Sequence, residues 1–387
     1  MTENRFRPRS LDSAAVGRTL ITVGNSALAV LLALAVGAIF ILISNQNPLD
    51  AYEALLKGAF GSRKAVAETL VASTPLIFGG LGFAIAFRAS MFNIGIEGQL
   101  IVGSLAAGLI GAANWGLSPW LYAPLAMMIG GIAGGVWGAI PGLLKARSGA
   151  SEVITTIMFN YLAFRLSTYM VTSAGNWLSL VDPQQKATNK VSPDSRLPII
   201  LDKTRLHAGF LVAIAISFLM WYLLFRTTFG YKIRTVGLSR GAADYAGIAW
   251  GATITKAMFI SGFLGGLAGA SETLGLLGRH YDNRAGYGFT AIAVGLVGRN
   301  NPIGVIFAGL LFGTLKSGSN AMQANAGPLA FRALVHLDSQ DLGFEQVRYA
   351  LAAGMQVTAE IKLGTRSIME YLLSPVQKAF HEAGRER

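Results

Sequence analysis

The stretch GQLIVGSLAAGLIGAANWGLSPWLYAPLAMMIGGIAGGVWGAIPGLL, residues 98–144, runs for 47 residues without a charge. A membrane-spanning helix needs about 20 mostly apolar residues, so this run is long enough for two crossings. The polar turn NWGLSPW lies between the two halves. The run has no regular alternation of apolar and polar residues, which favours helices over a membrane β-barrel.

Other charge-free runs surround this stretch. Residues 19–49 give 31 uncharged positions and residues 69–87 give 19. Hydrophobic residues make up 52% of the 387-residue chain and charged residues 13%, whereas an ordinary globular domain carries about 25% charged residues. No Gly/Ser-rich or Pro-rich linker divides the chain, so we expect one integral membrane domain over residues 1–387.

The fold class that follows is an all-α, polytopic bundle of about ten (8–10) transmembrane helices, some of them broken or half-helices. The eighth candidate is too short to cross unaided, which predicts a half-helix. The candidate spans are residues 20–44, 66–87, 92–113, 120–144, 152–173, 208–225, 254–274, 287–299, 302–319 and 346–363.

Glycine recurs at every fourth position in two of these spans. Gly130, Gly134, Gly138 and Gly142 form one series, and Gly262 and Gly266 form a second. Small residues at this spacing let helix backbones approach closely in lipid. The pattern predicts tight packing within the bundle.

Basic residues set the expected orientation. The N-terminal segment 1–18 is rich in arginine, and positive loops favour the cytoplasmic side. We therefore expect both termini in the cytoplasm, with a cytoplasmic tail at 364–387 and a cytoplasmic loop at 226–256. The polar loop 174–207 would then be external, either as a solvated connection or as a docking surface for a partner.

Motifs for several other chemistries are missing from the sequence. There is no GK dipeptide and hence no Walker A loop, no H-E-x-x-H, and no cysteine. We expect no catalytic residues, metal or cofactor. The net charge of +12 is spread over loops rather than gathered on one aromatic-bearing face, so nucleic acid is not an expected partner.

Two sets of polar residues interrupt the apolar spans. Asn93, Glu97 and Gln99 lie in MFNIGIEGQL, where two glycines weaken the helix, and Asn160 lies in SEVITTIMFNY. Ionisable groups within spans usually face a cavity or a partner. Two interpretations stay open: the four residues form a structural polar cluster, in which Glu97 bonds freed N–H groups, or they line a translocation pathway.

The loop 226–256 contains a short helix candidate, SRGAADYAGIAW. Within it Ala242, Tyr245, Ala246 and Ala249 share a face at helical spacing. Such a helix on the inner side of a bundle either docks on a partner or lies on the lipid surface.

Four stretches in this order resemble one family of transporters. GLSRGAADYAGI resembles the coupling segment of permease subunits of ABC importers. MFNIGIEGQ, SEVITTIMFNY and GYGFTAIAVGLVGRNNPIG resemble other conserved stretches of the branch that imports nucleosides and simple sugars, which is related to ribose and branched-chain amino acid permeases. The resemblance covers about residues 48–320.

The resemblance implies a multi-pass permease in the bacterial cytoplasmic (inner) membrane. Its implied partners are separate ATPase subunits that hydrolyse ATP, a second permease subunit, expected to be a different chain, and an external substrate-binding lipoprotein or periplasmic protein. It implies a nucleoside, or a simple sugar, as solute. An ion-gradient-driven secondary transporter is the alternative. The residues that would couple to the ATPase are Gly237, Ala242, Ala243, Tyr245, Ala246 and Gly247.

Overall fold

The computed structural model describes residues 28, 31–43, 46–113, 115–172, 180–282, 286–325, 341–344 and 347–350. The segments 1–18 and 364–387, for which we predict a cytoplasmic location, lie outside these residues. The chain divides into two units, Met1–Pro328 and Leu329–Arg387. The single domain over 1–387 stays a prediction.

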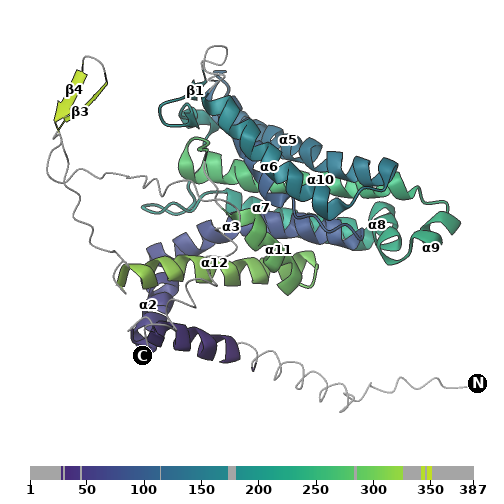
Figure 1. Cartoon of the computed structure of the whole chain (residues 1–387), viewed down its shortest axis with the longest axis horizontal. Helices are drawn as coiled ribbons and strands as arrows, with labels where there is room; N and C mark the ends of the chain where they lie inside the picture. Colours follow the sequence, from purple (N-terminus) through teal and green to yellow (C-terminus); the bar gives the residue numbers. More distant parts are fainter. Residues whose placement is uncertain are drawn as a thin grey trace, which may run out of the picture. The chain divides into compact units, whose positions relative to one another are not determined.

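The first unit is a helical bundle (Figure 1). A helix over Leu31–Ile43 precedes the labelled elements. The helices that follow are α2 (Pro48–Phe60), α3 (Arg63–Arg88), α4 (Ile96–Ala112), α5 (Pro119–Ser148), α6 (Glu152–Thr172), α7 (Gly209–Arg226), α8 (Thr228–Leu238), α9 (Arg240–Tyr245), α10 (Trp250–Ser271), α11 (Tyr287–Val297) and α12 (Pro302–Asn325). A π-helical stretch, η2 (Glu272–Leu277), continues α10.

Within the described ranges, five helices are long and apolar enough to span a membrane: Arg63–Arg88, Pro119–Ser148, Gly209–Arg226, Trp250–Leu277 and Pro302–Gln323. The helical, membrane-embedded character of the fold is therefore confirmed, while the number of crossings stays a prediction. The eighth candidate span is indeed short, since α11 has 11 residues.

Two expectations differ from the structure. Helix α2 was not predicted; it begins after the capping residue Asn47 and carries Pro48 in its first turn. At the start of the tenth candidate span, 346–363, residues 347–350 form a strand instead of a helix. The rest of that candidate lies outside the described residues. In the second unit, β3 (Asp341–Phe344) pairs antiparallel with β4 (Val347–Ala350).

The glycine series predicted from the sequence brings α5 against α10, which lie side by side in Figure 1. A Cβ added at Gly134 would lie 2.5 Å from the carbonyl oxygen of Gly262, and one at Gly130 would lie 2.8 Å from that of Gly103. Backbone is thus packed directly on backbone, and the predicted tight packing is confirmed. The central helix is α3, whose residues from Ser73 to Ala86 are all buried.

The two ends of α10 are built differently. At the end continued by η2, the segment 180–207 packs onto the bundle through a short hairpin, β1 (Val181–Asp182) with β2 (Ala187–Thr188), and a 3-10 turn, η1 (Pro193–Ser195). Backbone N–H groups of Thr188, Val191 and Leu197 donate to carbonyls of His280, Gly278 and Leu274. The described part of this loop is therefore no loose solvated connection. At the other end, α8 and α9 form a corner before α10 (Figure 1).

Candidate functional site

The polar residues of MFNIGIEGQL lie where the chain turns from α3 into α4. Asn93 is fully buried, and its amide exchanges hydrogen bonds with the amide of Gln99 at 3.1 and 3.2 Å. Asn93 also donates to Ser261 Oγ at 2.8 Å and accepts from the backbone N–H of Gly95 at 2.9 Å. Ser261 donates in turn to the carbonyl of Gly82 at 2.7 Å. This network joins α3, the start of α4 and α10.

Asn160 joins the same turn to α6. Its Oδ1 accepts from the N–H of Gly98 at 2.8 Å, and its Nδ2 donates to the carbonyl of Ile94 at 3.0 Å. A Cβ at Gly98 would lie 2.9 Å from Asn160 Oδ1, so glycine is needed for this approach. Asn160 therefore satisfies backbone groups that the break before α4 leaves free.

Glu97 connects α4 with the start of α11. Its two carboxylate oxygens accept from the N–H groups of Gly286 and Gly288, at 2.9 and 2.6 Å. Gly286 is the N-cap of α11 and has a left-handed backbone with φ of 71°. A carboxylate is favourable there, because the first N–H groups of a helix lack partners within the helix and carry partial positive charge. The glutamate in the apolar region thus caps a half-helix.

The four predicted cluster residues are at most 3% exposed, and all are bonded to protein groups. The structure brings Asn93, Glu97, Gln99 and Asn160 together around the start of α4. Their assignment to a pathway or to a structural cluster stays a prediction.

A second buried polar network, which the sequence analysis did not single out, lies beyond η2. His280 Nδ1 is 2.7 Å from Ser104 Oγ, and His280 Nε2 is 2.8 Å from Ser167 Oγ. Ser167 donates to Asp282 Oδ1 at 3.0 Å, and Thr168 donates to Asp282 Oδ2 at 2.8 Å. The network connects α4, α6 and the end of α10.

The proton positions in this network follow from the carboxylate. Because Ser167 gives its hydroxyl proton to Asp282, its oxygen accepts from His280 Nε2–H. His280 Nδ1 then accepts from Ser104, whose oxygen accepts from Thr273 Oγ1 at 2.6 Å. Burial lowers the pKa of His280 to about 4, against a smaller opposing effect of Asp282, so the imidazole is neutral at pH 7.

The residues predicted to couple to an ATPase lie at the opposite end of α10. Ala242, Tyr245 and Ala246 are exposed, and Tyr245 is 97% exposed. Ala243 is buried, and a Cβ at Gly237 would collide with the carbonyl oxygen of Arg88. Four of the six residues, Ala242, Tyr245, Ala246 and Gly247, are therefore exposed, while Ala243 and Gly237 pack inward.

The helix predicted for SRGAADYAGIAW is shorter than expected. Ser239 caps α9 by accepting from the N–H of Ala242 at 3.3 Å, but the helix ends at Tyr245. Gly247 has a left-handed backbone with φ of 67°, and Ala249 is extended before α10. Ala249 is exposed, as are the other three residues of the predicted face, but it lies outside the helix.

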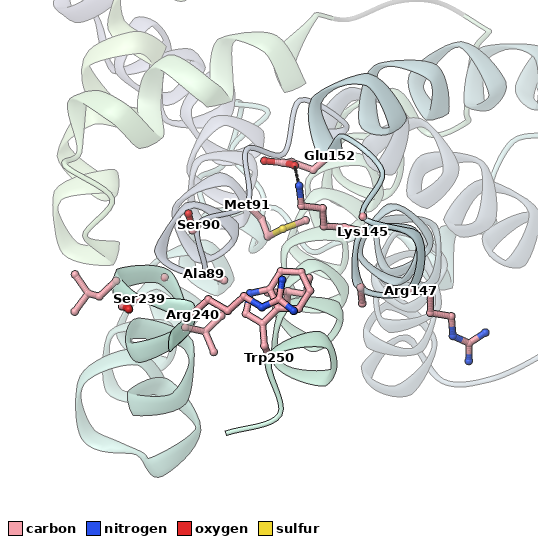
Figure 2. A pocket seen from close by; sticks show the side chains of 15 residues that line it. Ala89, Ser90, Met91, Lys145, Arg147, Glu152, Ser239, Arg240 and Trp250 are labelled. Carbon is pink, nitrogen blue, oxygen red and sulfur yellow. Dashed lines mark ion pairs between the residues drawn. The ribbon is translucent and has the colours of Figure 1, made fainter. Parts of the chain in front are cut away.

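A groove of ≈ 720 Å³ lies beside α9, between the α3–α4 turn, the α5–α6 turn and the start of α10 (Figure 2). Lys145 pairs with Glu152 across the α5–α6 turn at 2.9 Å. The Arg240 guanidinium lies over the ring of Trp250 at 4.3 Å. In Figure 2 Arg147 points away from this groove.

Arg234 of α8 and Arg88 of α3 contact the same aromatic ring of α7. Arg88 and Arg234 lie at 5.6 and 5.4 Å from the ring of Phe225. Arg88 also donates to the carbonyl of Asn300 at 3.0 Å. These contacts connect α8, through Phe225 of α7, with α3 and with the α11–α12 turn.

Residues 65–337 match the family described as the permease component of the branched-chain amino acid transport system. The chain belongs to this permease family. It is a membrane permease subunit of an ABC importer. The motif resemblance is thereby confirmed, and the secondary-transporter alternative is not favoured. No solved structure shows significant similarity to this permease.

Three curated relatives cover most of the permease. The guanosine ABC transporter permease protein NupP of Bacillus subtilis is 41% identical over 307 residues, 78% of this chain and 86% of NupP. The nucleoside ABC transporter permease protein NupB of Lactococcus lactis is 35% identical, over 78% of this chain and 85% of NupB. The glucose ABC transporter permease protein TsgB13 of Haloferax volcanii is 32% identical, over 79% of this chain and 83% of TsgB13.

Proposed function

We propose that this permease forms the membrane pathway for a nucleoside delivered by an external binding protein. The observation that carries the proposal is the 41% identity with a guanosine permease over 307 residues. A simple sugar is the second candidate, because a glucose permease is 32% identical. Selection between them would lie largely on the binding protein.

Uptake of labelled guanosine tests this proposal. Cells that lack the permease should regain uptake when it is supplied with its ATPase and binding protein, and unlabelled glucose should not compete. Restored uptake of labelled glucose, with no uptake of labelled guanosine, would exchange the two candidates. Loss of the P-loop lysine of the ATPase should abolish uptake in either case, because the ATP-driven step would then fail.

The coupling surface would be α9 with the adjoining groove. Support comes from the exposed side chains of Leu238 and Tyr245, 88% and 97% exposed, at the end of the bundle that carries α8 and α9. An apolar surface of this kind favours a protein partner. The ATPase subunits would contact Ala242, Tyr245 and Ala246 directly, while Gly237, Ala243 and Gly247 would set the shape of the corner.

We expect the end of the bundle that carries α8 and α9 to face the cytoplasm. The end that carries α8 and α9 also carries Lys145, Arg147, Arg226, Lys232 and Arg234, and positive loops favour the cytoplasm. Loop 226–256 would then be cytoplasmic and loop 174–207 external, in a bacterial inner membrane. The second permease subunit would be a different chain.

The cluster of Asn93, Glu97, Gln99 and Asn160 would brace the bundle rather than contact solute. The support is that the described hydrogen bonds of these buried side chains go to other protein groups. Solute contact would require these bonds to break, at a cost for each buried group.

A further inference from the structure

An apolar groove of ≈ 680 Å³ runs along the membrane-embedded surface between α5 and α7. Its walls include Met127 of α5 and Leu219 of α7, and Phe263 and Leu267 of α10 lie between them. The only charged residue among those that line it is Arg196. Because these helices span the membrane, the occupant of the groove must be apolar over most of its length.

A cationic cavity adjoins one end of this groove. It measures ≈ 800 Å³ and shares Arg196 with the apolar groove, while Lys190 and Arg279 also line it. Arg279 is held by Asp182 at 3.7 Å. Among the described residues no carboxylate is in ion-pair contact with Arg196, although Asp194 lines the same cavity.

The backbone is shaped to receive the Arg196 guanidinium. Gly278 has a left-handed backbone with φ of 71°, and a Cβ there would lie 3.0 Å from Arg196 Nη2. The guanidinium therefore lies flat against the turn that ends η2. This contact with the bundle fixes the guanidinium at the junction of the apolar groove and the cationic cavity.

The depth of this junction matches a membrane interface. Trp120 lines the groove in the first turn of α5 and is 89% exposed. Tryptophan is enriched where the hydrocarbon core meets the headgroups. Arg196 then lies at headgroup level, and the groove extends from it into the hydrocarbon core.

We propose that this groove binds an anionic phospholipid, with one acyl chain between α5 and α7 and the phosphate on Arg196. Charge complementarity selects a lipid over a helix of a second permease, because a phosphate offers acceptors to Arg196 where the groove meets the interface.

Native mass spectrometry of the full chain in a mild detergent tests the proposal by titration with phosphatidylglycerol and with phosphatidylcholine. Arg196→Gln should weaken phosphatidylglycerol binding about fivefold and remove the preference over phosphatidylcholine, because one interfacial cation is lost. The matched control is Lys203→Gln, an exposed basic residue of the same loop that lines neither cavity. Equal binding by these two variants would overturn the proposal.

A second pair of variants tests the apolar part. Leu219→Trp should fill the groove and weaken both lipids, whereas Leu211→Trp, equally exposed on α7 but outside the groove, should not. Met128→Trp blocks the groove from α5 if Leu219→Trp yields no monodisperse protein. Unchanged lipid binding together with loss of a co-purifying second permease would overturn the proposal and assign the groove to a protein interface.

Discussion

The two ends of α10 differ in whether their side chains are paired within the protein or exposed to solvent. Beyond η2, the hydroxyls of Ser104 and Ser167, the imidazole of His280 and the carboxylate of Asp282 form one continuous chain of hydrogen bonds. Before α10, Leu238 and Tyr245 stand almost fully in solvent beside an open groove. The buried polar groups of the first end are hydrogen-bonded to one another, whereas the second end presents exposed apolar side chains that a partner can cover.

The largest effect on stability should come from adding a side chain at the glycine where α11 packs on α4. A Cβ at Gly288 would collide with the backbone N of Glu97, so Gly288→Ala should destabilise the bundle by about 3 kcal/mol and reduce the yield of monodisperse protein. Gly241→Ala is the matched control, because its Cβ would meet nothing closer than 4.0 Å. Size-exclusion chromatography measures both. Equal losses would mean that the two regions are packed alike.

Glu97→Gln should have the next largest effect. Both carboxylate oxygens accept N–H groups of α11, and an amide offers only one oxygen, so one N–H would face an NH₂ group. We expect a destabilisation of about 2 kcal/mol, the range for bonds to a charged group. Thermal unfolding in detergent measures it, with the exposed Glu53→Gln as control.

Uptake by the Glu97→Gln variant separates the two roles of this residue. A residue that only braces α11 should lose transport in proportion to the loss of folded protein. Transport that disappears while the folded fraction is normal would instead place Glu97 in the pathway.

The two buried histidines near the η2 end should make the stability of the protein depend on pH. Burial lowers the pKa of both His207 and His280 from 6.5 to about 4. Between pH 6.5 and 4 the unfolded chain binds these protons and the folded chain does not, so stability is complete above pH 6.5 and falls as the pH falls. Each histidine should contribute a slope of up to about 1.4 kcal/mol per pH unit.

Thermal unfolding at pH 7, 6 and 5 measures this decline. His207→Asn should make it shallower, because the substitution removes one of the two titrating groups. The amide oxygen of Asn can still accept from the N–H of Gly209, as His207 Nδ1 does at 3.2 Å. A melting temperature that is flat from pH 7 to pH 5 would contradict the burial of neutral histidines at this end.

Five of the ten predicted spans correspond to described helices that are long and apolar enough to cross a membrane, because a long apolar run is visible in the sequence itself. Helix α2 was missed because Asp50, Glu53 and Lys57 interrupt its apolar residues, although the Asn47 cap before Pro48 signals its start. The end of α9 was placed too late, because the alanine-rich spacing outweighed the glycine at 247, whose left-handed backbone stops the helix.

The partners of the polar residues were not predictable from one sequence. Glu97 meets Gly286 and Gly288 about 190 positions later, and Ser104 meets His280 after 176 positions. Local spacing shows that a buried carboxylate or imidazole needs a partner, but not which helix supplies it. His280 could have been singled out by its place directly after a span, next to Asp282 and the glycine that ends η2.

Tyr245→Ala should have the smallest effect on stability and a large effect on coupling. The side chain is 97% exposed, so its removal should change the free energy of unfolding by no more than about 0.5 kcal/mol. If the ATPase covers this surface, however, an exposed aromatic at its centre should contribute strongly to docking. ATP hydrolysis stimulated by the binding protein should fall while the melting temperature stays constant. Tyr231→Ala, an exposed tyrosine on α8, is the matched control. Normal coupling by Tyr245→Ala would contradict the assignment of α9 to the ATPase contact. The ATPase would then dock on another part of the groove beside α9.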